Sequence, residues 1–219
     1  KNNLDAREKV DLIDFTAVDS IFESDKMIDF TLGNFIGSKA DFSNTHFGLG
    51  NLSFVKSEFG DFKVLFKGSS YSEGNNTFQY AKFNNGNVNF DNSTFENGNL
   101  SFVNTYFGDG NSSFKNIHFG NGDVSFAFST FNKGNITFDK SIFKNDTILY
   151  LEGYLFDKTE TKRAMIDLCK IARNNGSLIC LSLSDSFCVE RHRKDFFSLI
   201  KNYVNILFGN DQEINVLLN

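Results

Sequence analysis

Aromatic residues recur in this chain with a fixed period that leaves few folds open. From Phe30 to Phe143 they come in pairs whose members lie five residues apart, and the pairs repeat every twelve residues without insertion. Such regularity predicts a solenoid, in which similar units stack and bury a continuous core. The ten pairs are Phe30/Phe35, Phe42/Phe47, Phe54/Phe59, Phe66/Tyr71, Phe78/Phe83, Phe90/Phe95, Phe102/Phe107, Phe114/Phe119, Phe126/Phe131 and Phe138/Phe143.

The residues around each pair predict how the chain turns. An aliphatic residue such as Leu52 usually lies two positions before the first aromatic, and a small one such as Ser57 lies two positions before the second. This alternation is typical of short strands with one face inward. Between pairs comes a step such as Gly98-Asn99. We expect the glycine to supply a positive φ at a corner, and the asparagine side chains to form a ladder between coils.

The size of the phenylalanine ring limits the length of a coil. A twelve-residue coil with two faces would have to reverse through only about two residues, such as Asp91-Asn92. Facing sheets that enclose aromatic rings lie roughly 10 Å apart, which so short an arc hardly spans. We therefore expect four faces and about 24 residues per coil, twice the twelve-residue period.

A small residue followed two positions later by Phe, in five-residue units, resembles the pentapeptide-repeat family. The resemblance covers residues 28–143 and implies a right-handed quadrilateral β-helix. The chain departs from the family pattern because every second five-residue step is extended to seven, and the added pair includes the Gly-Asn dipeptide. The predicted fold class is accordingly a β-solenoid, followed by a segment of a different kind.

Charge and composition exclude several functions for the solenoid. The net charge of −5 and the isoelectric point near 5.2 argue against a basic face that binds nucleic acid. Residues 30–146 carry ten acidic and nine basic side chains, so they lack the strongly acidic surface that mimicry of DNA requires. No outward row repeats threonine regularly, which argues against ice binding. No long apolar run or signal-peptide pattern occurs, so we expect a soluble, cytoplasmic protein with reduced cysteines and no membrane partner.

The composition changes at about residue 146. Apolar strands are predicted at 147–151, 178–183 and 204–208, and they alternate with helices that begin at Asp157, at about Glu190 and after Asn210. Alternating strands and helices with apolar strands indicate a parallel α/β segment. The predicted organisation is thus an N-terminal cap (1–29), a Phe-cored β-helix of ten twelve-residue repeats (30–146) and a partial three-layer α/β segment (147–219).

Three blocks of this last segment resemble the ribokinase-like (PfkB) carbohydrate and nucleoside kinases, and most of all their adenosine-kinase-like members. The blocks are YLEGYLFD at 150–157, SLSDSFCVERHR at 182–193 and ILFGNDQE at 206–213. The resemblance places the N-x-x-E motif of the family on Asn210 and Glu213, with Glu213 holding Mg²⁺ through water near the phosphates of ATP. Hard oxygen ligands suit that ion. The same two residues are also a helix N-cap and its first-turn glutamate, and the sequence leaves both interpretations open.

Most of the kinase site has no counterpart in the chain. In the family, the glycine-rich anion hole and the catalytic aspartate follow this motif, and a substrate-binding region precedes it. We therefore predict no catalytic residue, no required cofactor and no kinase activity for this chain, with Mg²⁺ and ATP relevant only if the fragment is completed. Cys188 lies near Asp185 and His192 in the sequence, a grouping that suggests a thiol nucleophile. The kinase resemblance accounts for all three residues without that role. The abrupt junction between two unrelated patterns suggests a chimera or a gene fusion.

Two functions follow as expectations. The first is a non-catalytic scaffold or protein-interaction rod, whose partial α/β segment offers an exposed sheet edge to a protein partner or to a second copy of the chain. The alternative is a fragment of an ATP- and Mg²⁺-dependent sugar or nucleoside kinase. Extending the aromatic period by twelve residues reaches Tyr150 and Leu155, which predicts that the α/β segment continues the last coil and closes it.

Overall fold

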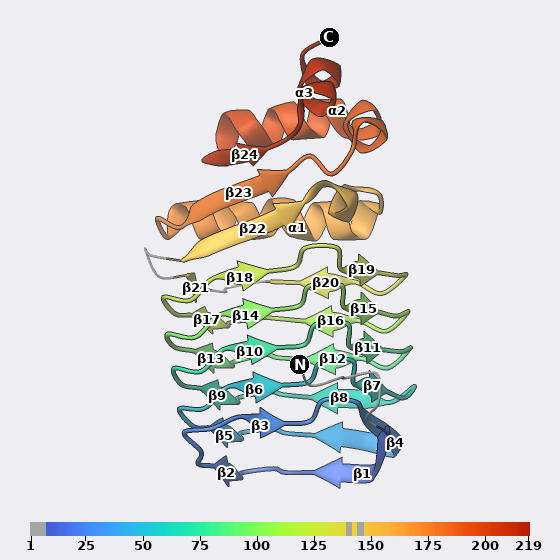
Figure 1. The fold of residues 1–219 in the computed structure, drawn as a ribbon, viewed down its shortest axis with the longest axis vertical. Helices are drawn as coiled ribbons and strands as arrows, with labels where there is room; N and C mark the ends of the chain where they lie inside the picture. Colours follow the sequence, from blue (N-terminus) through green and yellow to red (C-terminus); the bar gives the residue numbers. More distant parts are fainter. Residues whose placement is uncertain (1–7, 139–141, 144–146) are drawn as a thin grey trace.

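A computed structural model describes residues 8–138, 142–143 and 147–219 of the chain. The molecule is a column of stacked coils with a small α/β segment at its C-terminal end (Figure 1). Within the described residues, no helix combines the length and the apolar character needed to cross a membrane.

The column consists of short parallel strands connected by turns. The described strands of the solenoid are β1 (Val10–Thr16), β2 (Ile21–Phe22), β3 (Ile28–Asp29), β4 (Gly33–Asp41), β5 (His46–Phe47), β6 (Leu52–Ser53), β7 (Glu58–Phe59), β8 (Lys63–Leu65), β9 (Ser70–Tyr71), β10 (Asn76–Thr77), β11 (Lys82–Phe83), β12 (Val88–Asn89), β13 (Thr94–Phe95), β14 (Leu100–Ser101), β15 (Tyr106–Phe107), β16 (Ser112–Ser113), β17 (His118–Phe119), β18 (Val124–Ser125), β19 (Thr130–Phe131), β20 (Ile136–Thr137) and β21 (Ile142–Phe143).

The register of these strands gives the length of a coil. Phe35 pairs with Phe59, Phe59 with Phe83 and Phe83 with Phe107, so that paired residues are two twelve-residue repeats apart. The same spacing holds in four stacks of strands, two of which share the long strand β4. The expected coil of two repeats is confirmed. Strands β1, β2 and β3 already pair with this array, so residues 10–29 add strands to the solenoid.

The core of the column consists of stacked phenylalanine rings. Phe78 lies between Phe54 and Phe102, each at a centroid distance of 5.0 Å and nearly parallel to it. The same ring meets Phe66 and Phe90 edge-on at 5.5 Å, so neighbouring stacks interlock. All five rings are fully buried. Offset-stacked and edge-on pairs are both favourable arrangements for aromatic rings, which explains why one residue type suits the whole core.

The small residue of each repeat has a role between coils. The hydroxyl of Ser93 donates to the carbonyl oxygen of Phe66 at 2.8 Å, and that of Thr105 donates to Phe78 at 2.7 Å. Ser57, Ser69 and Ser129 make the same bond, and in each case the acceptor lies 27 positions earlier. A serine or threonine is therefore favoured because it fits beside the rings and satisfies a carbonyl of the preceding coil.

The corners confirm the asparagine ladder and correct the role of glycine. The backbone amide of Asn99 donates to Asn75 Oδ1 at 3.2 Å, and that of Asp123 donates to Asn99 Oδ1 at 2.8 Å. Gly98 has no positive φ. A Cβ at this position would lie 1.8 Å from the carbonyl oxygen of Gly74, so glycine is required by the close approach of adjacent coils. The left-handed conformation occurs instead at positions such as Asn92, with φ 60°.

The C-terminal segment continues the column. It contains β22 (Ile148–Glu152), the short 3₁₀ helix η2 (Gly153–Phe156), α1 (Thr159–Asn174), β23 (Leu178–Ser182), α2 (Ser186–Asn202), β24 (Ile206–Phe208) and α3 (Asp211–Leu218). Strand β22 pairs with β18 of the solenoid, and one sheet runs in the order β24-β23-β22-β18-β14-β10-β6-β3. Helix α1 lies across the last coil, in contact with β20 and β21 (Figure 1). The segment thus continues the last coil, as predicted, but in a different register: the aromatic period places Tyr150 opposite Phe126, whereas Tyr150 pairs with Ser125.

The three new strands are parallel, but their two faces differ. Leu149, Leu151, Ile179 and Leu181 are fully buried and belong to the same core as helix α1 and the solenoid. The opposite face carries Tyr150, Leu178, Ile206 and Phe208, which we call the outer apolar face. Its last three residues are 42–48% exposed.

Two helix boundaries differ from the predicted ones. Helix α1 begins after Lys158, because Asp157 closes η2 and its carboxylate pairs with α2. Helix α2 begins at Ser186, four residues earlier than predicted, because Asp185 caps it by accepting from the amide of Cys188 at 2.6 Å.

Candidate functional site at the carboxyl ends of the parallel strands

Strands β22, β23 and β24 end side by side at one edge of the sheet. Their last residues are Glu152, Ser182 and Phe208, which are direct partners in the parallel register. In open parallel sheets, ligands bind outside the carboxyl ends of the strands, where the following loops and helix N-termini converge. This edge is therefore the candidate functional site.

Glu152 is a buried carboxyl group on this edge, at the end of β22. It is 1% exposed, and Oε2 accepts from the amide of Tyr154 at 3.1 Å. Burial raises the pKa of Glu152, although the neighbouring Ser184 hydroxyl opposes that shift. Glu152 Oε1 and Ser184 Oγ nevertheless form no hydrogen bond of normal geometry. Ser184 itself has a left-handed backbone with φ 74°. Unsatisfied buried oxygens and a non-glycine residue in this conformation are typical of functional sites.

Asp185 links the 3₁₀ helix η2 to helix α2. One carboxylate oxygen caps the helix, and the other accepts from the hydroxyl of Tyr154. This hydrogen bond, together with burial, raises the pKa of Tyr154 to about 12, so the phenol stays protonated and acts as a donor. The same hydrogen bond lowers the pKa of Asp185. The pair therefore fixes η2 against the start of α2.

A second group of polar side chains lies beside this pair. Asp157 Oδ1 accepts from Arg191 and lies 2.7 Å from His192 Nε2, while Oδ2 accepts from Arg191 Nη2 at 3.1 Å. The thiol of Cys188 completes the group, which we call the Asp–Cys–His cluster (Asp157, Cys188 and His192), and the ligand atoms of its three members lie within 4.8 Å of one another. Burial raises the pKa of the Cys188 thiol to about 12. The thiol is therefore protonated at neutral pH, which argues against a role as a nucleophile.

The predicted magnesium residues lie at the end of the third strand. Asn210 Oδ1 accepts from the amide of Glu213 at 2.9 Å, and Glu213 Oε2 accepts from the amide of Asn210 at 3.0 Å, which forms a capping box at the start of α3. Glu213 Oε1 also accepts from Asn210 Nδ2 at 2.7 Å. The N-cap interpretation is confirmed. A carboxylate has about four lone-pair positions, so this arrangement leaves the magnesium prediction open.

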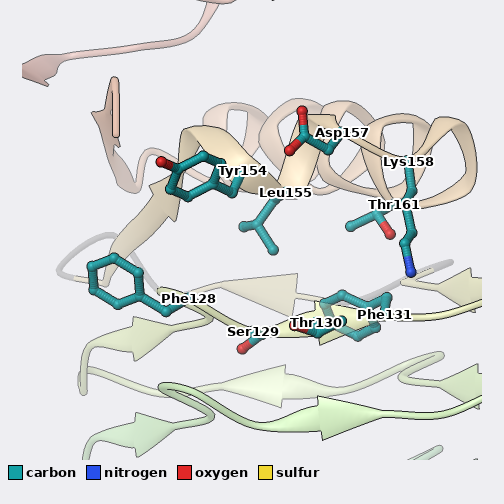
Figure 2. Close-up of a pocket in the computed structure, with 9 residues that line it drawn as sticks. All are labelled: Phe128, Ser129, Thr130, Phe131, Tyr154, Leu155, Asp157, Lys158 and Thr161. Atoms are coloured by element: carbon teal, nitrogen blue, oxygen red, sulfur yellow. The ribbon is translucent and has the colours of Figure 1, made fainter. Parts of the chain in front are cut away.

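A pocket lies between the last coil and the start of the α/β segment. Its volume is about 310 Å³, and Figure 2 shows Phe128 and Tyr154 at one side, Leu155 above its centre, and Lys158 with Thr161 at the other side. Lys158 extends downward, where its amino group donates to Asn132 Oδ1 at 3.1 Å. The pocket is lined by both parts of the chain, so any ligand there would depend on the junction.

Sequence patterns identified only part of this site. Asn210 and Glu213 were recognisable from a four-residue motif, and the structure brings them together. Glu152 was not singled out, although an acidic residue at the end of an apolar strand is a usable signal. The Asp–Cys–His cluster was missed because Asp157 is remote in sequence. The four-residue spacing of Cys188 and His192 on a helix was its only local sign.

Comparisons of the chain with protein-family models, with curated proteins and with solved structures found no match. The resemblances to pentapeptide-repeat proteins and to ribokinase-like kinases thus remain predictions from the motifs.

Proposed function

We propose that the protein is a non-catalytic scaffold: a rigid rod of the right-handed quadrilateral β-helix type, fused to a partial ribokinase-like segment that closes its end. The observation that supports this proposal most is the eight-stranded sheet that runs from β3 through β18 into β22, β23 and β24. A catalytic segment that must open and close on its substrates is usually joined to neighbouring domains by small, polar interfaces. Here the segment shares its sheet and its core with the rod.

The stacked core supplies the stiffness that a scaffold needs. Fully burying one phenylalanine contributes roughly 1.5–3 kcal/mol, and the solenoid repeats such residues in every coil. Contacts between neighbouring coils are then similar along the column, so that stability accumulates coil by coil. The rod would hold two bound partners at a fixed separation.

The proposed partner is a second copy of the chain, bound through the outer apolar face. Ile206 and Phe208 lie on β24, the last strand of the sheet, and Tyr150 packs against Phe208 at a ring distance of 5.9 Å. An exposed edge strand beside an apolar face favours pairing with another strand. A two-fold axis at this edge would bring identical apolar faces together, because such an interface is self-complementary.

Sedimentation analysis tests self-association. We expect the purified chain to be a dimer and the Ile206→Lys variant to be a monomer, because a charge at the edge opposes burial. Phe128→Lys is the matched control: Phe128 is 57% exposed on the solenoid, and Lys56 occupies the equivalent left-handed corner position three coils earlier. This control should remain dimeric. A wild-type chain that is folded and monomeric at all concentrations contradicts self-association.

The alternative, a fragment of an ATP- and Mg²⁺-dependent sugar or nucleoside kinase, is favoured by one observation. Buried Glu152 and the pair Asn210/Glu213 lie at the ends of β22 and β24, where such an enzyme would bind its ligands. Titration calorimetry with ATP–Mg²⁺ and with adenosine separates the two functions. We expect no binding. Binding by the wild type that is lost in Glu213→Gln would establish the kinase fragment, since glutamine can still cap α3 but lacks the charge.

A further inference from the structure

We propose that the Asp–Cys–His cluster (Asp157, Cys188 and His192) binds a divalent zinc ion. Its three members offer a carboxylate oxygen, a thiol sulfur and an imidazole nitrogen within 4.8 Å of one another, and zinc accepts all three ligand types. This proposal is independent of the scaffold function, because the cluster lies on α2 and the end of η2, away from the outer apolar face.

Helix α2 holds two of the three ligands in fixed positions. Cys188 and His192 are four residues apart, so both project from the same face of the helix. Cys188 is fully buried, and the His192 side chain is only 13% exposed and packs near Phe156 and Phe196. Ligands on a helix whose side chains are fixed by packing lose little freedom when a metal ion binds.

Asp157 supplies the third ligand and the route for entry. Its side chain is 38% exposed, which leaves a path for the ion and a fourth position for water. On binding, the ion would displace to solvent both the proton of the Cys188 thiol and the proton between His192 Nε2 and Asp157 Oδ1, which are 2.7 Å apart. Asp157 Oδ2 would keep its hydrogen bond from Arg191, and this bond would orient the carboxylate.

The other ring nitrogen of His192 also has a suitable neighbour. His192 Nδ1 lies 3.9 Å from Asp195 Oδ2, and Lys162 pairs with the same Asp195 oxygen at 2.9 Å. Histidines that bind metals commonly direct their second nitrogen at a carboxylate, which fixes the ring orientation. His192 thus has the surroundings of a metal ligand at both ring nitrogens: Nε2 faces the proposed ion, and Nδ1 faces the Asp195 carboxylate.

The thiol distinguishes a zinc site from a plain ion-pair network. Arg191 and His192 alone satisfy the Asp157 carboxylate, so an ion-pair network has no need for a cysteine beside it. Sulfur ligands favour zinc over magnesium and calcium, which prefer oxygen. The Asp–Cys–His cluster therefore differs in chemistry from the magnesium position predicted at Glu213.

The test is a titration of the reduced full chain with Co²⁺, the spectroscopic substitute for zinc, followed by displacement with Zn²⁺. We expect a thiolate-to-cobalt charge-transfer band that saturates at one equivalent and disappears when Zn²⁺ is added. Cys188→Ser should abolish the band, and Asp157→Asn should weaken Co²⁺ binding by about tenfold or more. Cys169→Ser is the matched control, since Cys169 is equally buried, in α1, and belongs to no such cluster among the described residues. It should leave the spectrum unchanged.

Two results overturn the proposal. One is the absence of a charge-transfer band in the folded wild-type chain. The other is a band that persists in Cys188→Ser, because the sulfur ligand would then come from another cysteine. If circular dichroism shows that Cys188→Ser is unfolded, His192→Gln decides the question, since it keeps the thiol and a side chain of similar size. Wild-type affinity for Co²⁺ in His192→Gln would exclude the cluster as the site.

Discussion

Tyr150 pairs directly with Ser125 in the parallel sheet that joins the solenoid to the α/β segment. Earlier partners in this sheet are 24 residues apart, whereas these two are 25 residues apart. The α/β segment therefore enters the sheet of the solenoid with one additional residue, yet it keeps the inward and outward phase. Leu149 follows Val124 on the buried side and is itself fully buried. Strand β22 therefore continues the sheet of the solenoid.

This joint predicts shared protection of backbone amides. In hydrogen-exchange measurements on the intact chain, the amides of 149–152 should exchange as slowly as those of the solenoid strands at 100–101, because both lie inside one sheet. The end of α3, which is exposed at Leu218, should exchange faster and serves as an internal reference. Rapid exchange of 149–152 alongside slow exchange of 100–101 would show that the segment is not part of the column.

The hydroxyl bonds between coils predict a pair of opposite effects. Ser93→Ala removes the bond to the Phe66 carbonyl and should lower the free energy of unfolding by about 1 kcal/mol. Ala81 occupies the same position of its repeat, is fully buried and has no hydroxyl. Ala81→Ser should therefore gain a bond to Phe54 and raise the free energy of unfolding by up to about 1 kcal/mol. Urea denaturation measures both, and equal effects of the same sign would contradict the explanation.

Tyr71 predicts a stabilising substitution. It replaces phenylalanine in one stack, where it lies between Phe47 and Phe95 at 5.1 and 4.3 Å. Its hydroxyl is buried and forms no hydrogen bond of normal geometry, although it lies near the Ser69 hydroxyl, which itself donates to the carbonyl oxygen of Phe42. Tyr71→Phe should raise the free energy of unfolding by about 1–3 kcal/mol by removing this unsatisfied group. Tyr106→Phe is the control, because Tyr106 is 36% exposed and should change stability little. A loss of stability in Tyr71→Phe would reveal a partner for the hydroxyl.

The period of the aromatic pairs was enough to predict the solenoid. The size of the phenylalanine ring then predicted a coil of two repeats, because a single repeat is too short to enclose such rings. The role of Gly98 could not be predicted in the same way. Its need for a small side chain arises from the carbonyl of Gly74 in the preceding coil, which is adjacent only in space. A positive φ is the commoner reason for a corner glycine, and here Asn92 has that conformation instead.

The candidate site was predictable only where one segment contains all of its parts. Asn210 and Glu213 form their capping box within a single short motif, so that motif was sufficient. Glu152 acquires its properties from the loop that contains Ser184, and Asp157 meets His192 although the two lie on different elements. Such groups assemble only when the strands are in parallel order, and their sequence spacing carries no signal of that proximity.

Glu152 predicts how stability depends on pH. Because burial raises its pKa above the ordinary value of 4.5, the folded protein holds this proton more tightly than the unfolded chain does. The contribution of the neutral group to stability is therefore fully present below pH 4.5 and is lost as the pH rises through the folded pKa. Glu152→Gln, which stays neutral, should be more stable than the wild type at neutral pH and should lack this decline. Urea denaturation at a series of pH values measures both effects.

Glu58 provides a control of opposite sign. Its hydrogen bond from Lys9 lowers its pKa, so its contribution is present above pH 4.5 and is lost as the pH falls through the folded pKa. Glu58→Gln should therefore reduce stability slightly at neutral pH, since the pair lies at the surface. If Glu152→Gln were less stable than the wild type at neutral pH, the buried carboxylate would have to be charged and paired. A cation or a ligand donor would then have to occupy the space beside Ser184.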